Sequence, residues 1–132
     1  MARIEGSTDV KTWKGSYSFA VDGGVKDAAI ALRSNDGPIP VGSYILTGIL
    51  EVTTALDSSG SATAALSVEA ANDLVSAAAF GGAPWSTTGK KSVVPVATGA
   101  TAIKTTASRV PALLVGTANI TDGVFDLILT YR

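Results

Sequence analysis

Few side chains in this sequence are of a type that could carry out chemistry. It contains no His and no Cys, which excludes a zinc finger, a thiol nucleophile, a Ser-His-Asp triad and an imidazole base. Asp57, Asp73 and Asp122 remain as candidates for an acid–base pair or a calcium site. No Asp-x-Asp or Asp-x-Asn spacing indicates a calcium loop, and each aspartate lies beside a turn or cap signal, where carboxylates accept backbone N–H groups. We therefore expect a protein that is not an enzyme, with no catalytic residue, metal or cofactor.

One Gly-Lys pair, Gly89-Lys90, suggests a phosphate-binding loop but fails its pattern. The loop requires a glycine five residues before Gly89, where this chain has Pro84. It also requires Ser or Thr after the lysine, where this chain has Lys91. We expect a solvated loop here.

The triplet Asn119-Ile120-Thr121 matches the acceptor sequence for N-glycosylation. The N-terminus lacks the apolar run of a signal peptide, so the match has no context of export. The alternative is a hairpin turn, helped by the Asp-Gly pair that follows. We expect the turn, and synthesis in the cytoplasm.

Charge and hydropathy exclude two further classes of protein. Charged residues make up 16% of the 132 residues and the net charge is −1. Binding to nucleic acid needs a basic surface, so this balance argues against it. No window approaches 18 consecutive apolar residues, so no segment is predicted to span a membrane.

Alternation of apolar and polar residues predicts strands along most of the chain. A single helix is predicted over Asn72–Phe80, with a cap at Asn72 or Asp73 and a stop at Gly81-Gly82. The strands are expected over Tyr17–Val21, Val25–Leu32, Tyr44–Leu56, Ala62–Val68, Ser92–Ala97, Ala102–Thr106, Ala112–Thr117 and Val124–Tyr131. This pattern predicts an all-β fold: a single-domain β-sandwich or jelly roll of about eight antiparallel strands with one short helix.

Short polar turns separate two pairs of these strands. The run 57–60 separates the strands around Leu50 and Leu66, and the run 119–123 separates the last two strands. Each pair is predicted to form a hairpin. Gly48, inside a long apolar strand, predicts a bulge or a close backbone approach.

The last strand divides into two faces. Its more hydrophobic set, formed by Phe125, Leu127, Leu129 and Tyr131, is predicted to point inward. Val124 and Ile128 then point outward and are candidates for an interface between identical subunits. Nearly half of the chain is Ala, Gly, Ser or Thr. Small side chains bury little apolar area, so the core of one subunit would be thin, and burial of strand faces between identical subunits would add to it. The alternative is that Val124 and Ile128 pack against a second sheet.

Trp13 and Trp85 lie outside strongly alternating segments. Partly exposed tryptophans are favoured at interfaces because they add a large apolar area with a polar handle. Both are therefore candidates for contact with a partner. The alternative is that they plug an end of the sandwich.

The first sixteen residues alternate charged and small polar groups. Residues 1–16 are predicted to be an arm that orders on contact with a partner, and residues 17–132 the β-sandwich domain. A frayed tail is the alternative for the arm.

Two regions of the sequence resemble the small all-β virion proteins of tailed bacteriophages. The first is the long strand ending Val52-Thr53-Thr54-Ala55-Leu56-Asp57 with the following Ser58-Ser59-Gly60-Ser61-Ala62-Thr63 and the preceding Pro38-Ile39-Pro40-Val41-Gly42. The second comprises Val110-Pro111-Ala112-Leu113-Leu114-Val115 and the run from Thr121 to Tyr131. Together they resemble capsid decoration, or cement, proteins of the jelly-roll kind.

The resemblance implies a homotrimer on the outer surface of the virion, at local symmetry axes of the capsid. It would tie neighbouring major capsid proteins together, and multivalent attachment would stabilise the lattice. It implies no catalytic residue and no cofactor. The alternatives are a carbohydrate-binding or adhesive β-sandwich module, and a head-fibre or tail component.

Overall fold

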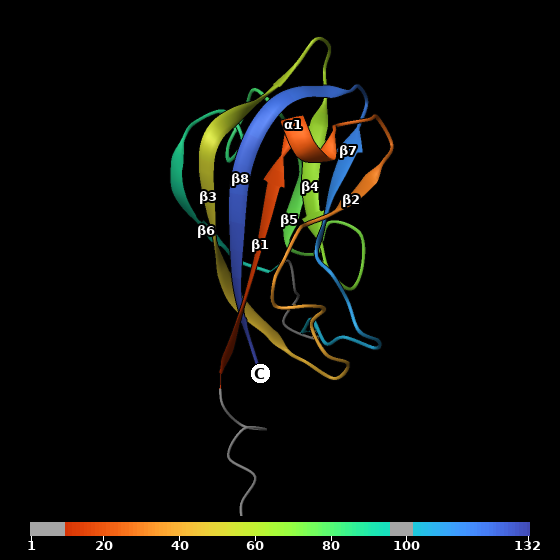
Figure 1. The fold of residues 1–132 in the computed structure, drawn as a ribbon, viewed down its shortest axis with the longest axis vertical. Helices are drawn as coiled ribbons and strands as arrows, with labels where there is room; N and C mark the ends of the chain where they lie inside the picture. The colour runs from red at the N-terminus through yellow and green to blue at the C-terminus, as the bar shows by residue number, and fades with distance from the viewer. Residues whose placement is uncertain (1–9, 96–101) are drawn as a thin grey trace, which may run out of the picture.

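The computed structural model of the chain describes residues 10–95 and 102–132. They form eight strands and one four-residue helix (Figure 1). In chain order the elements are β1 (Lys11–Ser18), α1 (Phe19–Asp22), β2 (Ala29–Ala31), β3 (Ile45–Ser58), β4 (Thr63–Ser67), β5 (Val75–Ala79), β6 (Gly89–Val93), β7 (Ala112–Gly116) and β8 (Ile120–Tyr131). The predicted all-β class and the predicted number of strands are confirmed.

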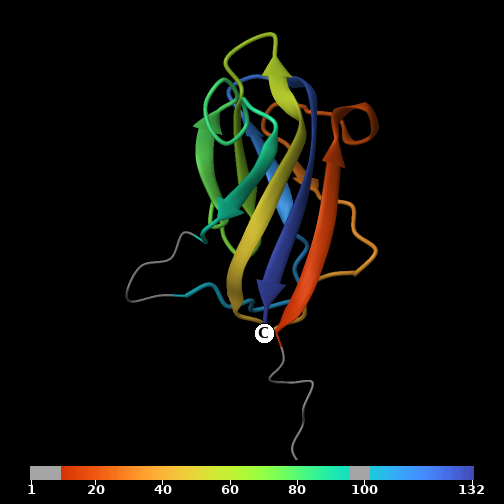
Figure 2. The ribbon, with the colours of Figure 1, turned by 90° about the vertical axis from the view of Figure 1, so that its left-hand side faces the viewer.

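The strands form two four-stranded antiparallel sheets that pack face to face. One sheet has the order β1-β8-β3-β6 and the other β2-β7-β4-β5. Figure 2 shows the first sheet, with β8 between β1 and β3. Apart from β4 and β5, consecutive strands lie in different sheets, so the chain crosses repeatedly from one layer to the other. This is the strand order of a jelly roll, one of the two predicted architectures.

The two predicted hairpins are wrong for the same reason. β3 and β4 lie in different sheets, as do β7 and β8. Each strand buries one face, and a polar turn allows the chain to close over the core instead of folding back within one sheet. The turn signals were correct, but the pairing that follows a turn depends on where the apolar faces are buried.

The predicted helix over Asn72–Phe80 is also wrong: Val75–Ala79 forms β5 and pairs with β4. The carboxylate of Asp73 does not cap a helix. It accepts the N–H groups of Val68, Glu69 and Ala70 at 2.8–3.0 Å and so holds the turn between the two strands. A nine-residue helix is marginal by itself, and pairing with β4 satisfies the same backbone groups.

The boundary expected at residue 16 falls inside a strand. Residues 11–16 of the expected arm belong to β1, which pairs with β8 from Lys11↔Tyr131 to Ser18↔Val124. Trp13 and Tyr17 alternate with polar residues and face the core, which is why this stretch is a strand. Residues 1–9 of the arm lie outside the described residues.

Three other predicted strands differ in extent. The strand predicted over Tyr17–Val21 ends at Ser18 because α1 follows. The strand predicted over Val25–Leu32 is reduced to Ala29–Ala31. Within 102–106 the structure has only an isolated bridge between Tyr44 and Lys104. Residues 96 and 97, at the end of the strand expected from Ser92, lie outside the described residues.

The core fills the space between the sheets. The predicted inward face of β8 is confirmed: Phe125, Leu127 and Leu129 are fully buried, and Tyr131, at the end of the strand, is half-buried against the core. Gly48 on β3 marks a close approach, as predicted: a Cβ there would lie 2.7 Å from the carbonyl oxygen of Ile128 and from a methyl group of Leu129. Only glycine allows β3 to lie this close to β8.

Candidate interaction surface

Trp13 does not reach the surface. It is 1% exposed, and its indole Nε1–H donates to the carbonyl oxygen of Gly37 at 2.7 Å. A Cβ on Gly15 would clash with the ring of Trp13, so the absence of a side chain there makes room for the indole. The predicted partner contact at Trp13 is therefore wrong, because the ring packs in the core.

Trp85 is also buried, at 0% exposure. It lies in the connection between β5 and β6, where its Nε1–H donates to the carbonyl oxygen of Ala64 at 3.1 Å. Its ring centroid lies 5.4 Å from that of Phe125. The predicted partner contact is wrong here too. The alternative, a plug that closes one end of the sandwich, describes Trp85 well.

Burial of both tryptophans removes the aromatic platform that a carbohydrate-binding module would need. Among the aromatic side chains of the chain, all of which lie in the described part, Tyr44 alone is exposed. The structure therefore gives no support to the carbohydrate-binding alternative.

Val124 and Ile128 lie on the outward face of β8, where both are half-buried. Ile128 is the cross-strand partner of Ile49, which is 46% exposed. The rest of this face is mainly polar: it carries Thr12, Thr130, Thr47, Ser16, Asp126 and Glu51. The outward face thus offers one small apolar centre, the Ile49–Ile128 pair.

The carboxylates of Asp57 and Asp122 accept backbone N–H groups, as their positions beside turn signals indicated. Asp57 and Asp122 are cross-strand partners on β3 and β8. However, each accepts the N–H of the residue that follows it, at 2.8 Å, and both are exposed. The described residues include no group of three or more acidic, His or Cys side chains that could hold a metal ion.

The Gly89-Lys90 pair and the Asn119-Ile120-Thr121 triplet both belong to the structural framework. Gly89 and Lys90 begin strand β6, and no helix follows them in the described part. Asn119 accepts the N–H of Lys26 at 2.7 Å through its side chain and the hydroxyl of Ser58 at 2.6 Å through its carbonyl. Gly89 and Lys90 therefore lie in a strand and not in the expected solvated loop. Asn119 lies in the connection between β7 and β8, which is not the expected hairpin turn because the two strands belong to different sheets.

Exposed apolar side chains collect at one end of the sandwich, which we call the base. At the base, β1, β3 and β7 begin and β6 and β8 end (Figure 1). Six of the nine exposed large hydrophobic residues of the described part lie there. We call these six the basal rim: Val10, Val41, Tyr44, Leu46, Val94 and Val110, each between 40% and 76% exposed.

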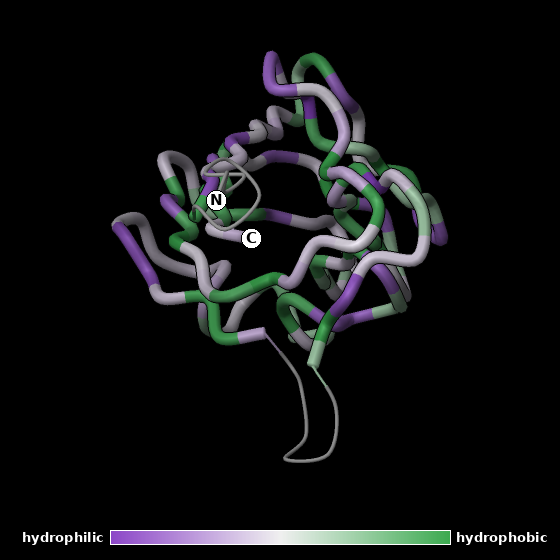
Figure 3. Tube along the Cα trace, turned by 90° about the horizontal axis from the view of Figure 1, so that it is seen from below, coloured by the Kyte–Doolittle hydropathy of each residue, from purple (hydrophilic) through white to green (hydrophobic). Residues whose placement is uncertain are grey.

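The basal rim is held on a fixed framework. Tyr44 exchanges two backbone hydrogen bonds with Arg132, at 2.8 and 3.0 Å, and the Lys104 ammonium lies 5.3 Å from its ring centroid. Arg109, next to Val110, exchanges two backbone hydrogen bonds with Ile39. Figure 3 looks onto this end and shows hydrophobic and hydrophilic residues interspersed along the loops around it. Apolar groups on pre-ordered loops can be buried by a partner with little loss of conformational entropy.

The opposite end has a smaller apolar surface. Val21 and Val25 are exposed there, at 68% and 65%, beside a shallow hollow of about 320 Å³ lined by Phe19 and Ile120. Asp57 and Asp122 lie at the same end. This surface has fewer apolar side chains than the basal rim, and its two valines provide a matched comparison for it.

Sequence reasoning missed the basal rim. Its members are single apolar residues in separate loops and strand ends, without a shared period. Val41 and Val110 lie in segments that carried the family resemblance, Pro38–Gly42 and Val110–Val115. The available signal was an apolar residue beside Pro or Gly in a loop, where a core role is least expected.

Comparison with known proteins identifies the fold. No model of a known protein family and no curated protein matches the chain. Chains in three solved phage capsids do share its structure. One, from the capsid asymmetric unit of cyanophage Pam1, is 24% identical, with a TM-score of 0.60 over 93% of this chain and 84% of that one.

The other two similar chains come from different phages. A chain in the acid-stable capsid of Helicobacter pylori bacteriophage KHP30 is 13% identical, with a TM-score of 0.60 over 94% of this chain and 87% of that one. A chain in the capsid of Ralstonia phage GP4 is 17% identical, with a TM-score of 0.65 over 94% and 84%. No helix in the described part is both long and apolar enough to cross a membrane. The expected resemblance to phage virion proteins is confirmed at the level of the fold, which this chain shares with chains of three phage capsids.

Proposed function

We propose that the protein is a capsid decoration protein of a tailed phage, which binds the outer surface of the capsid and stabilises the lattice of major capsid proteins. The observation that carries this proposal is the fold, which the chain shares with capsid chains of three phages over 93–94% of its length. The described residues include no group of acidic, His or Cys side chains that could hold a metal ion, and their large apolar side chains are buried between the sheets. Adhesion is the function that this arrangement supports best.

The base is the surface that we assign to the capsid contact. Burial of a single valine or leucine side chain contributes about 1.5–3 kcal/mol. The six side chains of the basal rim therefore supply enough apolar area for attachment, and Lys104 adds positive charge beside Tyr44. This contact replaces the one expected at Trp13 and Trp85, which are buried.

We further propose that the protein associates with itself through the outward face of β8, where Val124 and Ile128 lie. The Ile49–Ile128 pair gives that face its apolar centre. A homotrimer would attach to the lattice at several points, and each contact after the first would be intramolecular.

The capsid contact is tested by co-sedimentation with empty capsid shells that lack this protein. Val41→Asp combined with Val94→Asp places two carboxylates in the basal rim, at side chains that are 62% and 76% exposed. Burial of unpaired charges is unfavourable, so we expect at least a tenfold loss of binding, which is about 1.4 kcal/mol. Because both side chains are exposed, the melting temperature should be unchanged.

The matched control is Val21→Asp combined with Val25→Asp at the opposite end. Those side chains are 68% and 65% exposed, and the net charge changes by the same amount. The control should bind like the unmodified protein. Equal loss of binding in both variants would overturn the assignment to the base, and absence of binding by the unmodified protein would overturn the decoration role.

A further inference from the structure

The two sides of the sandwich differ in how they are closed. On one side, Ser16 of β1 and Arg33, just after β2, exchange backbone hydrogen bonds of 2.8 and 3.0 Å that join the sheets. On the other side, β5 and β6 form the facing edges, and in the described part of the chain no hydrogen bond joins them. The sandwich is therefore open between β5 and β6.

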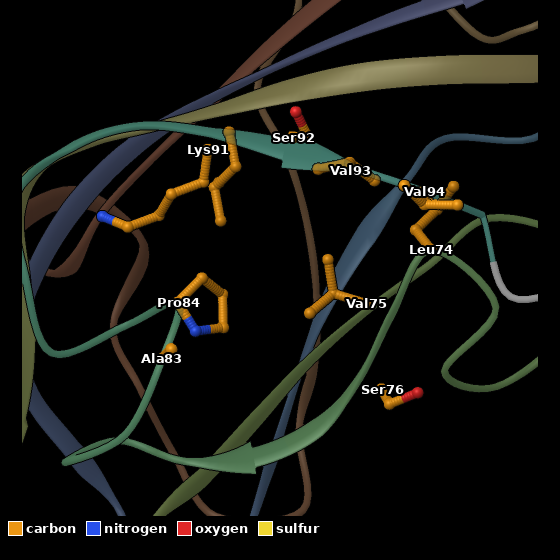
Figure 4. Close-up of a pocket in the computed structure, with 10 residues that line it drawn as sticks. Leu74, Val75, Ser76, Ala83, Pro84, Lys91, Ser92, Val93 and Val94 are labelled. Carbon is orange, nitrogen blue, oxygen red and sulfur yellow. The ribbon is translucent and has the colours of Figure 1, made fainter.

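A cavity of about 460 Å³ occupies this opening. Its floor consists of core residues that are at most 2% exposed: Leu50 of β3, Val93 of β6, and Leu74, which directly precedes β5. Figure 4 shows Val75 and Pro84 pointing into the space below β6. An apolar side chain placed in this cavity would extend the core.

β5 is an edge strand whose pairing with β4 contains a β-bulge but whose side chains offer no defence against the addition of a strand. The other edges carry the usual defences against pairing, since β6 contains Lys90 and Lys91, β1 contains Lys11 and Lys14, and β2 has only three residues. β5 has the sequence VSAAA, with no charge and no proline. Its backbone is therefore free of the side-chain devices that block the addition of a strand.

The orientation of the β5 backbone suits such an addition. Phe80 donates its N–H to the carbonyl oxygen of Ala62 at 3.0 Å, and Ala79 is the cross-strand partner of Thr63. Because N–H groups alternate along a strand, the N–H of Ala79 points away from β4, toward the open edge. An added strand would find a donor there.

The charge at the cavity restricts what can be added. Lys91 is the one charged residue among the described residues that line the cavity, and none of those residues is acidic. Its ammonium donates to the carbonyl oxygen of Thr87 at 2.6 Å and has no ion-pair partner in the described part. A carboxylate from a partner would complement it.

We propose that the β5 edge binds an extended segment of another protein chain by strand addition. A bulky apolar side chain of that segment would fill the cavity, and an acidic side chain two residues away would face Lys91. Side chains two residues apart in a strand share one face, so one segment can satisfy both requirements. Backbone hydrogen bonds to β5 would supply affinity, and the cavity and Lys91 would supply specificity.

Synthetic peptides test this without a capsid, so the result is independent of the decoration role. The probe is Thr-Thr-Leu-Thr-Glu-Thr-Thr, titrated into the isotopically labelled full chain and followed by NMR. We expect amide shifts to concentrate on Val75–Ala79 and near Lys91. Replacing the glutamate of the peptide with lysine should weaken binding about fivefold, as expected for reversal of one partly exposed ion pair.

Two variants and a control sharpen the test. Lys91→Glu should reverse the preference, so that the lysine peptide binds more tightly than the glutamate peptide. Ala79→Pro removes an outward-facing donor and should weaken both peptides. Lys14→Glu, on the far edge β1, should leave binding unchanged. Equal binding of the two peptides by the unmodified protein, or shifts away from β5, would overturn the proposal; if Ala79→Pro does not fold, the Lys91→Glu reversal still decides it.

Discussion

Three buried aromatic residues have both an apolar and a polar role in this core. The polar atoms of Trp13, Trp85 and Tyr17 each donate to a backbone carbonyl, at 2.7, 3.1 and 2.6 Å. No buried side-chain nitrogen or oxygen of the described part lacks a partner. Aromatic residues are only 6% of the chain. Their concentration between the sheets compensates for the small side chains around them.

Tyr17 makes stability depend on pH in the alkaline range. Burial, followed by the charges of Asp22 and Asp122, raises the pKa of Tyr17 to about 12 from its ordinary value of 10.0. The folded protein holds this proton more tightly than the unfolded chain. The stabilisation is therefore complete below pH 10 and is lost as the pH rises toward 12, at up to about 1.4 kcal/mol per pH unit.

Urea unfolding between pH 8 and 12 measures this effect against Tyr17→Phe. The variant should lose about 1 kcal/mol at pH 8, because the hydrogen bond to Gly23 is absent. Its stability should then fall less steeply than that of the unmodified protein above pH 10. Tyr44→Phe, at an exposed site, is the control and should keep the steep slope. Parallel curves for Tyr17→Phe and the unmodified protein would contradict the prediction.

At the scale of elements, the sequence predicted strands well where burial alternates and poorly where small residues dominate. β8 has large apolar residues at Phe125, Leu127 and Leu129, so this inward face was predictable, although the strand begins at Ile120 and not at Val124. In β5, Ala77, Ala78 and Ala79 favour a helix by intrinsic propensity, yet they form a strand. Pairing with β4 decided between them, and local sequence does not encode that pairing.

A polar clasp between two loops gives a prediction at this scale. Glu69, just after β4, accepts the N–H and hydroxyl of Thr106 at 3.1 and 2.7 Å and the Nε of Arg109 at 2.9 Å. These hydrogen bonds, with those from Thr106 foremost, hold the pKa of Glu69 below its ordinary value of 4.5. The clasp is therefore present above pH 4.5 and is lost as the pH falls through the lowered pKa.

Glu69→Gln should loosen the clasp at pH 7. We expect faster hydrogen exchange at the amides of Thr106 and Arg109, with little change in the β-sheets. Glu51→Gln is the control, because it removes an exposed ion pair with Lys90 of 3.8 Å on β3 and β6. Unchanged exchange at Thr106 in Glu69→Gln would show that the carboxylate does not hold the loop.

At the scale of the whole molecule, self-association predicts a measurable mass. If the outward face of β8 joins subunits, light scattering should give about three times the chain mass of 13.2 kDa at micromolar concentration. Ile49→Lys places a charge beside Ile128 at a half-exposed position and should shift the mass toward 13.2 kDa. Val21→Lys, at the end of the sandwich opposite the base, should leave the mass unchanged. A mass of 13.2 kDa for the unmodified protein would contradict the proposed self-association.

The candidate surface was less predictable than the fold because only the three-dimensional arrangement creates it. Trp13 and Trp85 lie in segments that resemble loops, yet the structure buries both of them. Val41 and Val94 share no periodic pattern in the sequence. They lie at the same end of the sandwich only because the chain crosses repeatedly between the two sheets. A residue's type indicates what it could bind, whereas the path of the chain determines whether it is exposed.

The position of β8 constrains the order in which the protein can fold during synthesis. β8 pairs with β1 on one side and with β3 on the other, so Tyr131 is the cross-strand partner of both Lys11 and Ile45. While the ribosome still holds residues 120–131, β1 has no neighbour in its sheet and β3 has only β6. The first sheet therefore becomes continuous only after β8 has emerged, and until then the edges of β1 and β3 that will pair with β8 are exposed to other chains.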